Sequence, residues 1–407
     1  MHEDFSAVMQ SRTIPPLQPT LSHLTPSIVG LPVEPLAAPE FGDRALLAPL
    51  FRSGNWIEAP LEPELPMPSP SSQPLALGIY DISVQPADTP ELSAAQFSGT
   101  TGYGIVNAAA AVAQAIAAPT ENFFEVPNQG GNNWGLDRVQ APEVWAQGYA
   151  GQGIIVAVVD TGVDYTHPDL DDNIWINSGE FPNDGIDNDG NGFVDDIFGW
   201  NFVDRTNQPF DEDGHGTHVA GTIAAENNGF GITGVAYNAQ IMPVKVLGPN
   251  GGTYADVAAG IRYAADNGAQ VINLSLGGNT SSYSVTEAVR YATERGAVVV
   301  MASGNEGRVQ PSFPANLART WGISVGAIDW NNHLATFSNR AGWTPLDFVV
   351  APGVSILSTT PNSTYSYFSG TSMATPHVAG VAALMLSANS SLQPAHVETL
   401  IVQTATT

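Results

Sequence analysis

Residues 154–160 have the sequence IIVAVVD, an apolar and mostly β-branched stretch that ends in the carboxylate of Asp160. This composition predicts a buried β-strand. Four further strands are predicted at Ile241 to Leu247, Val271 to Leu276, Val298 to Ala302 and Ile323 to Ala327. Helical periodicity lies between strands, notably at Tyr254 to Asn267 and Val285 to Arg295. The alternation predicts an α/β fold: a three-layer, doubly wound parallel sheet with helices on both faces and ligands at the carboxyl ends of the strands.

The amino-acid composition and the periodicity of the sequence change along the chain. Residues 1–95 are rich in proline and have little periodicity, so we expect an extension that is either disordered or a propeptide. Residues 96–133 are predicted to form an alanine-rich helix from residue 102 to residue 116 and then a Gly/Asn linker. Residues 134–407 hold the strand and helix alternation and form the predicted main domain.

The composition excludes several classes of function. Twelve Lys and Arg against 39 Asp and Glu give a net charge of −27, which repels nucleic acid and anionic membranes. No apolar run approaches the roughly 18 residues that a membrane span needs. The chain has no cysteine, so disulfides, thiolate metal sites and a thiol nucleophile are excluded. We expect a monomer with neither nucleic-acid nor membrane partners.

Three short segments place reactive side chains among glycines and small residues. They are VAVVDTGVD around Asp160, DGHGTHVAGT around His215 and SGTSMATPHVAG around Ser372. Each segment alone has a plain structural explanation: the aspartate could cap a turn, the histidine could be structural, as we expect for His218, and the serine could cap a helix. Together on one α/β scaffold they indicate a Ser-His-Asp catalytic triad.

In the chain order Asp, His, Ser, these three contexts resemble the subtilisin-like serine peptidases, the subtilase family, in its calcium-dependent bacterial form. The resemblance extends from about Trp134 to Thr407. It implies a serine endopeptidase in which Ser372 is the nucleophile, His215 the general base and Asp160 the carboxylate that orients the base. Asn305, in VVMASGNEG, matches the family's oxyanion donor and would act with the backbone N–H of Ser372.

Two alternatives of other classes remain at this point. A catalytically silent relative could bind peptides or calcium as a scaffold, although all four catalytic side chains are retained. An esterase or lipase could use the same triad. Its GxSxG elbow is absent, however, because Ser372 stands in GTSMA.

The resemblance also implies how a polypeptide substrate is held. Two segments would bind an extended peptide by strand addition, with Ser275, Leu276 and Gly277 on one side and Gly251 and Gly252 on the other. The S1 pocket would be lined by four small residues, Gly277, Ala302, Ser303 and Gly304. A roomy pocket without a buried charge predicts a preference for large apolar P1 residues.

An acidic loop predicts a calcium site. Asp187, Asp189, Asn191 and Asp195 occupy positions 1, 3, 5 and 9 of a DxDxNG loop, and Phe193 offers a carbonyl. Position 12, where an EF-hand has glutamate, is a phenylalanine, so we expect Asp196 to complete the ligand shell. The alternative is a solvated acidic loop, in which carboxylates repel one another without a cation.

The resemblance implies a second calcium site. The side chains of Asp169, in HPDL, and Asn228, in AENNGFGITG, match the family's high-affinity loop. The backbone carbonyls of Glu226, Phe230 and Ile232 would complete the shell. Both sites together imply Ca²⁺ as a stabilising cofactor.

The N-terminal region leaves two hypotheses open. The family commonly has an inhibitory propeptide in this position, and residues 1–125 could be a cleavable intramolecular propeptide of a zymogen. However, TGYGIVNAAAAVAQA resembles the segment that usually ends the family's catalytic domain, so the second hypothesis is a permuted arrangement in which the helix from residue 102 to residue 116 docks in place of that segment. No export signal is recognisable in MHEDFSAVMQ. The calcium loops and the absence of cysteine favour a secreted or periplasmic location.

Overall fold

The structure is a computed structural model, which describes residues 96–126 and 133–407. The predicted Pro-rich extension, residues 1–95, lies outside the described residues. So do residues 127–132, which include most of the predicted Gly/Asn linker.

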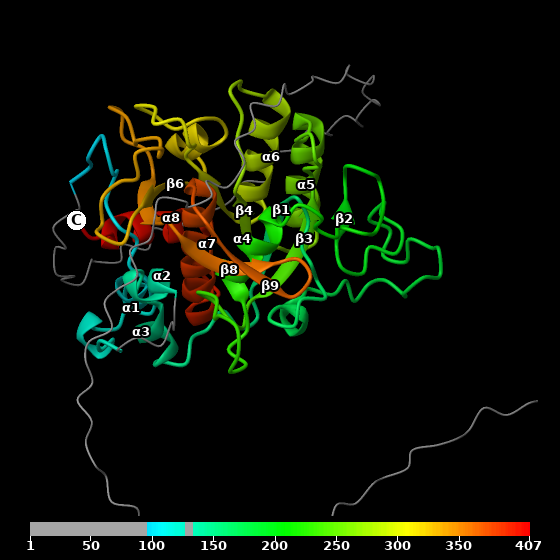
Figure 1. The fold of residues 1–407 in the computed structure, drawn as a ribbon, viewed down its shortest axis with the longest axis horizontal. Helices are drawn as coiled ribbons and strands as arrows, with labels where there is room; N and C mark the ends of the chain where they lie inside the picture. The colour runs from blue at the N-terminus through cyan, green and yellow to red at the C-terminus, as the bar shows by residue number, and fades with distance from the viewer. Residues whose placement is uncertain (1–95, 127–132) are drawn as a thin grey trace, which may run out of the picture. The chain divides into compact units, whose positions relative to one another are not determined.

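One parallel sheet of seven strands organises the described part of the chain, in the order β2-β3-β1-β4-β5-β6-β7 (Figure 1). Its strands are β1 (Ile155–Asp160), β2 (Trp200–Asn201), β3 (Gln240–Lys245), β4 (Val271–Leu274), β5 (Val298–Ala302), β6 (Ile323–Ile328) and β7 (Phe348–Pro352). The five predicted strands are present within a few residues, whereas β2 and β7 were not predicted. The spatial order reverses at β1, between β3 and β4, and ligands of α/β sheets bind at such a switch point.

Helices cover both faces of this sheet, which confirms the predicted fold class. Alternate β1 residues face opposite ways, so Val156 and Val158 join one apolar core while Ala157 and Val159 join the other. The first core includes residues of α1 (Ala108–Ala115), α3 (Ala141–Trp145), α4 (His215–Ala224), α7 (Thr371–Ala388) and α8 (Pro394–Thr404). The second includes residues of α5 (Tyr254–Asp266) and α6 (Tyr283–Glu294).

Smaller elements complete the fold. A short helix, α2 (Trp134–Arg138), precedes α3. Three 3₁₀ turns lie at η1 (Thr120–Asn122), η2 (Asp171–Asn173) and η3 (Ala315–Arg319). An antiparallel hairpin of β8 (Ile356–Thr360) and β9 (Thr364–Phe368) leads into α7. In the described residues no helix is both long and apolar enough to cross a bilayer.

The alanine-rich helix is shorter than predicted. It begins at Ala108, because the side chain of Asn107 accepts a hydrogen bond from the N–H of Ala110 and so caps the first turn. The residues before it are extended along β7. A Cβ atom at Gly102, whose φ is +60°, would lie 2.1 Å from the carbonyl oxygen of Phe348, so this approach requires glycine.

The N-terminal segment, residues 98–115, packs against the end of the chain. Backbone N–H groups of Tyr103 and Val106 donate to Phe348 and Val350 of β7 at 2.9 and 3.1 Å. Ile105 exchanges two backbone hydrogen bonds with Thr406. The apolar side of α1 belongs to the same core as α7 and α8. The N-terminal segment therefore contributes to the sheet edge and to one helical layer.

Deleting residues 1–120 should destabilise the protein strongly, since it removes fully buried side chains such as Val106 and Val112 together with the β7 contacts. We expect a loss on the order of 5 kcal/mol in the free energy of unfolding, measured by denaturant unfolding. The control is deletion of residues 1–95, which leaves every described residue in place. Equal stability of the two truncated proteins would contradict a structural role for the N-terminal segment.

Candidate active site

Asp160 ends the central strand β1 at the carboxyl edge of the sheet. Its side chain is fully buried. The Oδ1 atom accepts a hydrogen bond from the N–H of Thr161 at 2.7 Å and lies 2.7 Å from Nδ1 of His215. Oδ2 is buried and has no hydrogen-bond partner among the described residues. The strand thus presents one carboxylate, already oriented, to the first residue of α4.

His215 begins α4, and both of its neighbours are glycines. A Cβ atom at Gly216 would lie 2.0 Å from the carbonyl oxygen of Gly162, so only glycine lets α4 approach the end of β1 this closely. Because Asp160 can only accept, the Nδ1 atom of His215 carries the proton of their hydrogen bond. The other ring nitrogen, Nε2, is buried without a partner among the described residues. Its lone pair is therefore available to accept a proton.

The environment of His215 favours the imidazolium form. Burial lowers the pKa of His215, but the negative charge of Asp160 and its hydrogen bond raise it, and the charges of Asp211 and Asp213 add to this. The net effect raises the pKa above its ordinary value. His218, one turn further on, differs: burial lowers its pKa to about 3, and Nε2 lies near the carbonyl oxygens of Ile356 and Ser366.

Ser372 is the second residue of α7 and is buried. Its hydroxyl donates to the carbonyl oxygen of Ser275 at 3.1 Å, and the hydroxyl of Ser275 donates back to the carbonyl of Ser372 at 2.8 Å. In the parallel register Val158 of β1 pairs with Asn273 of β4, which places Asp160 level with Ser275. The two adjacent strand ends therefore bring the serine and the Asp–His pair to the same edge. The serine hydroxyl and Nε2 of His215 are not hydrogen-bonded to each other.

Asn305 follows β5 and lies beside the start of α7. Its Oδ1 accepts from both the N–H and the hydroxyl of Thr371, each at 2.9 Å. Since the backbone N–H can only donate, this contact fixes the orientation of the amide. A Cβ atom at Gly370 would lie 3.4 Å from Nδ2 of Asn305 and 3.6 Å from the N–H nitrogen of Ser372. Two donors thus flank one small space in front of Gly370.

The two predicted peptide-binding segments contain backbone N–H groups without hydrogen-bond partners in the described part of the chain. Among the described residues, the N–H groups of Leu276, Gly277 and Gly252 have no hydrogen-bond partner. Gly278 is paired with Phe313, and Gly251 with Gly248, so the open groups lie between paired ones. Such N–H groups can donate hydrogen bonds to the carbonyl oxygens of an added peptide strand.

The predicted S1 wall is buried, and sequence analysis missed a carboxylate beside it. Ala302, Ser303 and Gly304 are all buried. Glu306 lies next to Gly304: its Oε2 atom would be 2.9 Å from a Cβ placed there. This carboxylate accepts hydrogen bonds from Ser312 and Asn339 and is partly exposed. Its position three residues after Ser303, in a turn, gave no periodic signal that could have marked it.

A small apolar hollow next to Leu276 was also missed. Its free volume is about 10 Å³. The lining residues are Tyr254, Val257, Leu276, Gly277, Gly278, Val285, Phe313 and Pro314. They belong to α5, α6 and two loops, so only the folded chain brings them together. Side chains at its walls would have to move to admit a substrate residue.

The predicted acidic loop brings together three carboxylates. Ligand atoms of Glu180, Asp187 and Asp189 all lie within 4.8 Å of one another. Asp195 instead accepts from the N–H groups of Asp184 and Gly185. Glu180 lies outside the loop spacing that the sequence showed, and the folding of the chain brings it to Asp187.

Two further predicted ligands of this loop make hydrogen bonds within the protein. Asp196 is fully buried and accepts from Asn177, Asn191 and the hydroxyl of Tyr263. Asn191 directs Nδ2 towards Asp189 as well, while its Oδ1 accepts from the N–H of Phe193. A cation at the three clustered carboxylates would relieve their repulsion, so these oxygen donors fit Ca²⁺.

The second predicted calcium loop also gathers oxygen atoms. Asp169 is fully buried, and its Oδ2 accepts from the N–H of Ile232, whereas Oδ1 has no partner among the described residues. Asn228 donates to Glu226, and its Oδ1 accepts from the N–H of Phe230. A buried carboxylate oxygen without a partner is costly unless a cation binds it, so the residues fit the predicted ion.

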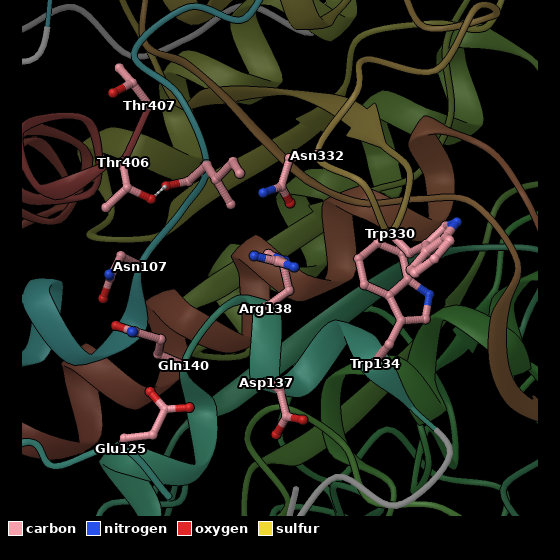
Figure 2. A pocket seen from close by; sticks show the side chains of 11 residues that line it. Asn107, Glu125, Trp134, Asp137, Arg138, Gln140, Trp330, Asn332, Thr406 and Thr407 are labelled. Atoms are coloured by element: carbon pink, nitrogen blue, oxygen red, sulfur yellow. Dashed lines mark hydrogen bonds between the residues drawn. The ribbon is translucent and has the colours of Figure 1, made fainter. Parts of the chain in front are cut away.

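A separate recess of about 600 Å³ lies where the N-terminal segment meets the chain end (Figure 2). Trp134, Arg138 and Trp330 contribute to its wall, together with Ile105 and Thr406. None of the predicted catalytic, substrate-binding or metal residues lines it. The recess is therefore distinct from the candidate active site.

Comparison with known proteins gives the class. Residues 151–407 match the Subtilase family. The chain is 45% identical to Subtilisin BL of Lederbergia lenta over 274 residues, which are 67% of this chain and 91% of that protein. It is also 45% identical to an alkaline protease of Alkalihalobacillus alcalophilus, again over 67% of this chain but only 64% of that protein. Thermitase of Thermoactinomyces vulgaris is 42% identical over 66% of this chain and 85% of its own.

A solved structure agrees with these relatives. The crystal structure of a cold adapted subtilisin-like serine proteinase matches with a TM-score of 0.50 and 34% identity, over 62% of this chain and 81% of that one. A parallel α/β fold with these matches defines the class as the subtilisin-like proteins. The chain belongs to the subtilase family.

Proposed function

We propose that this protein cleaves polypeptides through an acyl-enzyme intermediate on Ser372. One observation is the main support: the buried 2.7 Å contact between Asp160 and Nδ1 of His215, which leaves Nε2 free to act as a base. Proton transfer requires the Ser372 hydroxyl to leave the carbonyl of Ser275 and turn to Nε2. Such catalytic contacts often tighten only when substrate binds.

The chemistry then has two halves. Ser372 Oγ attacks the scissile carbonyl while His215 takes its proton, and the imidazolium passes that proton to the departing amine. In the second half, His215 takes a proton from water, whose oxygen attacks the acyl-enzyme, and the imidazolium returns that proton to Oγ of Ser372 as the bond between Oγ and the acyl carbon breaks. The charge of Asp160 stabilises the imidazolium in both halves.

The developing oxyanion would lie between Nδ2 of Asn305 and the N–H of Ser372. Thr371 fixes the amide, so these donors need no rearrangement when charge develops. The N–H of Ser372 also belongs to the first turn of α7, whose positive dipole end favours an anion.

The substrate would be an extended peptide held by the open backbone groups of Leu276, Gly277 and Gly252. The small residues from Ala302 to Gly304 favour a large apolar P1 side chain. Glu306, beside Gly304, adds a negative charge that would also attract a basic P1 residue. We therefore propose broad endopeptidase specificity with apolar preference.

Calcium and the N-terminal region complete the proposal. Ca²⁺, when bound at the acidic loop and at the Asp169 loop, would supply positive charge that holds these loops folded. The contacts of the N-terminal segment with β7 and Thr406 favour the permuted arrangement over a propeptide that includes that segment. Residues 1–95 could still act as a propeptide. We further propose a monomeric enzyme that works outside the cytoplasm.

The nucleophile can be tested with a fluorophosphonate probe and a denatured protein substrate. We expect the wild-type chain to be labelled at Ser372 and to cleave, whereas Ser372→Ala does neither because it lacks the attacking hydroxyl. Mass spectrometry locates the label and the cuts. Ser369→Ala, three residues away, is the matched control and should retain labelling. Labelling of Ser372→Ala would contradict the proposal.

The pH dependence follows from the raised pKa of His215. Only neutral imidazole can accept the serine proton, so activity is lost as the pH falls through this pKa. We expect kcat/KM to rise with pH through an apparent midpoint above about 6.5, the ordinary value for histidine. Initial rates on a peptide substrate from pH 5 to 10 provide the measurement. A midpoint below the ordinary value would contradict the assigned electrostatics.

Chelation tests the calcium sites, with Ser372→Ala used to prevent self-digestion. EDTA should lower Tm by about 10 °C or more, because uncompensated carboxylates then repel one another, and added Ca²⁺ should restore it. Asp169→Asn and Asp187→Asn should each reduce this shift. Glu294→Gln, an exposed acid on α6, is the control. An unchanged Tm in excess EDTA would contradict both sites.

A further inference from the structure

Asp211 is a fully buried carboxylate that no step of the proposed chemistry uses. It lies four residues before His215. Its two oxygens accept five hydrogen bonds of 2.7 to 3.0 Å: from the hydroxyl of Thr161, from the N–H groups of Asp213, Gly214 and Thr217, and from the hydroxyl of Thr217. Donors therefore saturate its lone pairs.

These donors come from both sides of the Asp–His pair. Thr161 directly follows the catalytic aspartate at the end of β1. Gly214 and Gly216 flank the catalytic histidine at the start of α4. The hydroxyl of Thr161 donates to Asp211 and accepts from the N–H of Gly216 at 2.9 Å. Asp211 thus links Thr161, which follows Asp160, to Gly214 on one side of His215. The hydroxyl of Thr161 extends the link to Gly216 on the other side.

The same carboxylate caps α4. Gly214, in the N-cap position, has no side chain to satisfy the first N–H groups of the helix. Asp211 accepts from Gly214 and Thr217 instead, and its charge suits the positive end of the helix dipole. The hydroxyl of Thr217 also accepts from the N–H of Asp164 at 2.9 Å, which extends the network into the loop after β1.

Lys245 holds this network from the other side. It is buried at the end of β3, next to Asp160 in the sheet register. Its Nζ atom donates to the carbonyl oxygens of Thr161 and Phe210 at 2.6 and 3.1 Å. Phe210 directly precedes Asp211. The ammonium group therefore fixes the backbone beside both carboxylates, so the network cannot shift as a unit.

We propose that Asp211 is a positioning residue of the peptidase, which sets the imidazole of His215 against Asp160 through Thr161, Gly214 and Gly216. This inference rests on the proposed function. It predicts that a change at Asp211 acts on kcat rather than on substrate binding, because none of its contacts involves the peptide-binding segments.

A positioning role has an electrostatic signature. Burial lowers the pKa of His215, and Asp160, Asp211 and Asp213 raise it in that order. His218, whose pKa burial lowers to about 3, is uncharged over the pH range of the test, and Lys245 carries the opposing positive charge in this network. Removal of the negative charge of Asp211 should therefore lower the pKa of His215. The acid limb of the pH profile, which is the rise of kcat/KM with pH, should then move to lower pH.

The test is Asp211→Asn in the full chain. An amide NH₂ would face N–H and O–H donors, so the network must rearrange. A displacement of the imidazole by about 1 Å costs about 100-fold, and we expect a loss of that size in kcat with KM within about threefold of wild type. The midpoint of the acid limb should fall. Asp213→Asn is the matched control: it removes a nearby charge, should lower the midpoint, and should keep kcat.

The outcomes separate this inference from the proposed function. Wild-type protein that neither cleaves nor reacts with the fluorophosphonate probe contradicts the proposed function. An active wild type with an unchanged kcat and pH profile in Asp211→Asn contradicts only the positioning role. A lower Tm with an unmoved acid limb also overturns it. If Asp211→Asn does not fold, Thr161→Val removes one link alone and should lower kcat about tenfold; an unchanged kcat would overturn the inference.

Discussion

The register between β1 and β4 is the constraint on which the rest of this structure depends. It places Asp160 level with Ser275 at one edge of the parallel sheet. Asp160 orients His215, and Ser275 anchors the hydroxyl and carbonyl of Ser372. A slip of one residue would turn the side chains of one strand to the other face. The pairing of β1 with β4 therefore sets the relative positions of the three segments around Asp160, His215 and Ser372.

Polar groups buried at this edge are tolerable because the backbone supplies their partners. Lys245 donates hydrogen bonds to two carbonyl oxygens. Asp211 accepts hydrogen bonds from three N–H groups and two hydroxyls. Some buried atoms without partners in the described residues belong to groups with a proposed task, such as Nε2 of His215 and Oδ1 of Asp169, whereas others, such as Nδ1 of His218 and Oδ1 of Asn273, do not. The buried charges that hold the site together are therefore those whose hydrogen bonds are satisfied within the protein.

Sequence reasoning predicted the central strands and the residues that meet at their ends, because apolar runs with short glycine-rich turns are strong local signals. It missed β7, because β7 follows β6 without a helix between them and the prediction relied on strands that alternate with helices. It missed Glu180 as a neighbour of Asp187, because that carboxylate lies outside the loop spacing. The network of Asp211 stayed hidden as well, because hydrogen bonds between segments leave no periodic trace in a sequence.

The meeting of Ile105 with Val350 and Thr406 has a consequence for how the molecule is made. Residues 98–115 are synthesised before their partners on β7, α7 and α8, which lie much further along the chain. Contacts of such long sequence separation form slowly, after much loop entropy has been lost. The scaffold that holds the candidate active site therefore cannot close until the chain has been synthesised as far as Thr406.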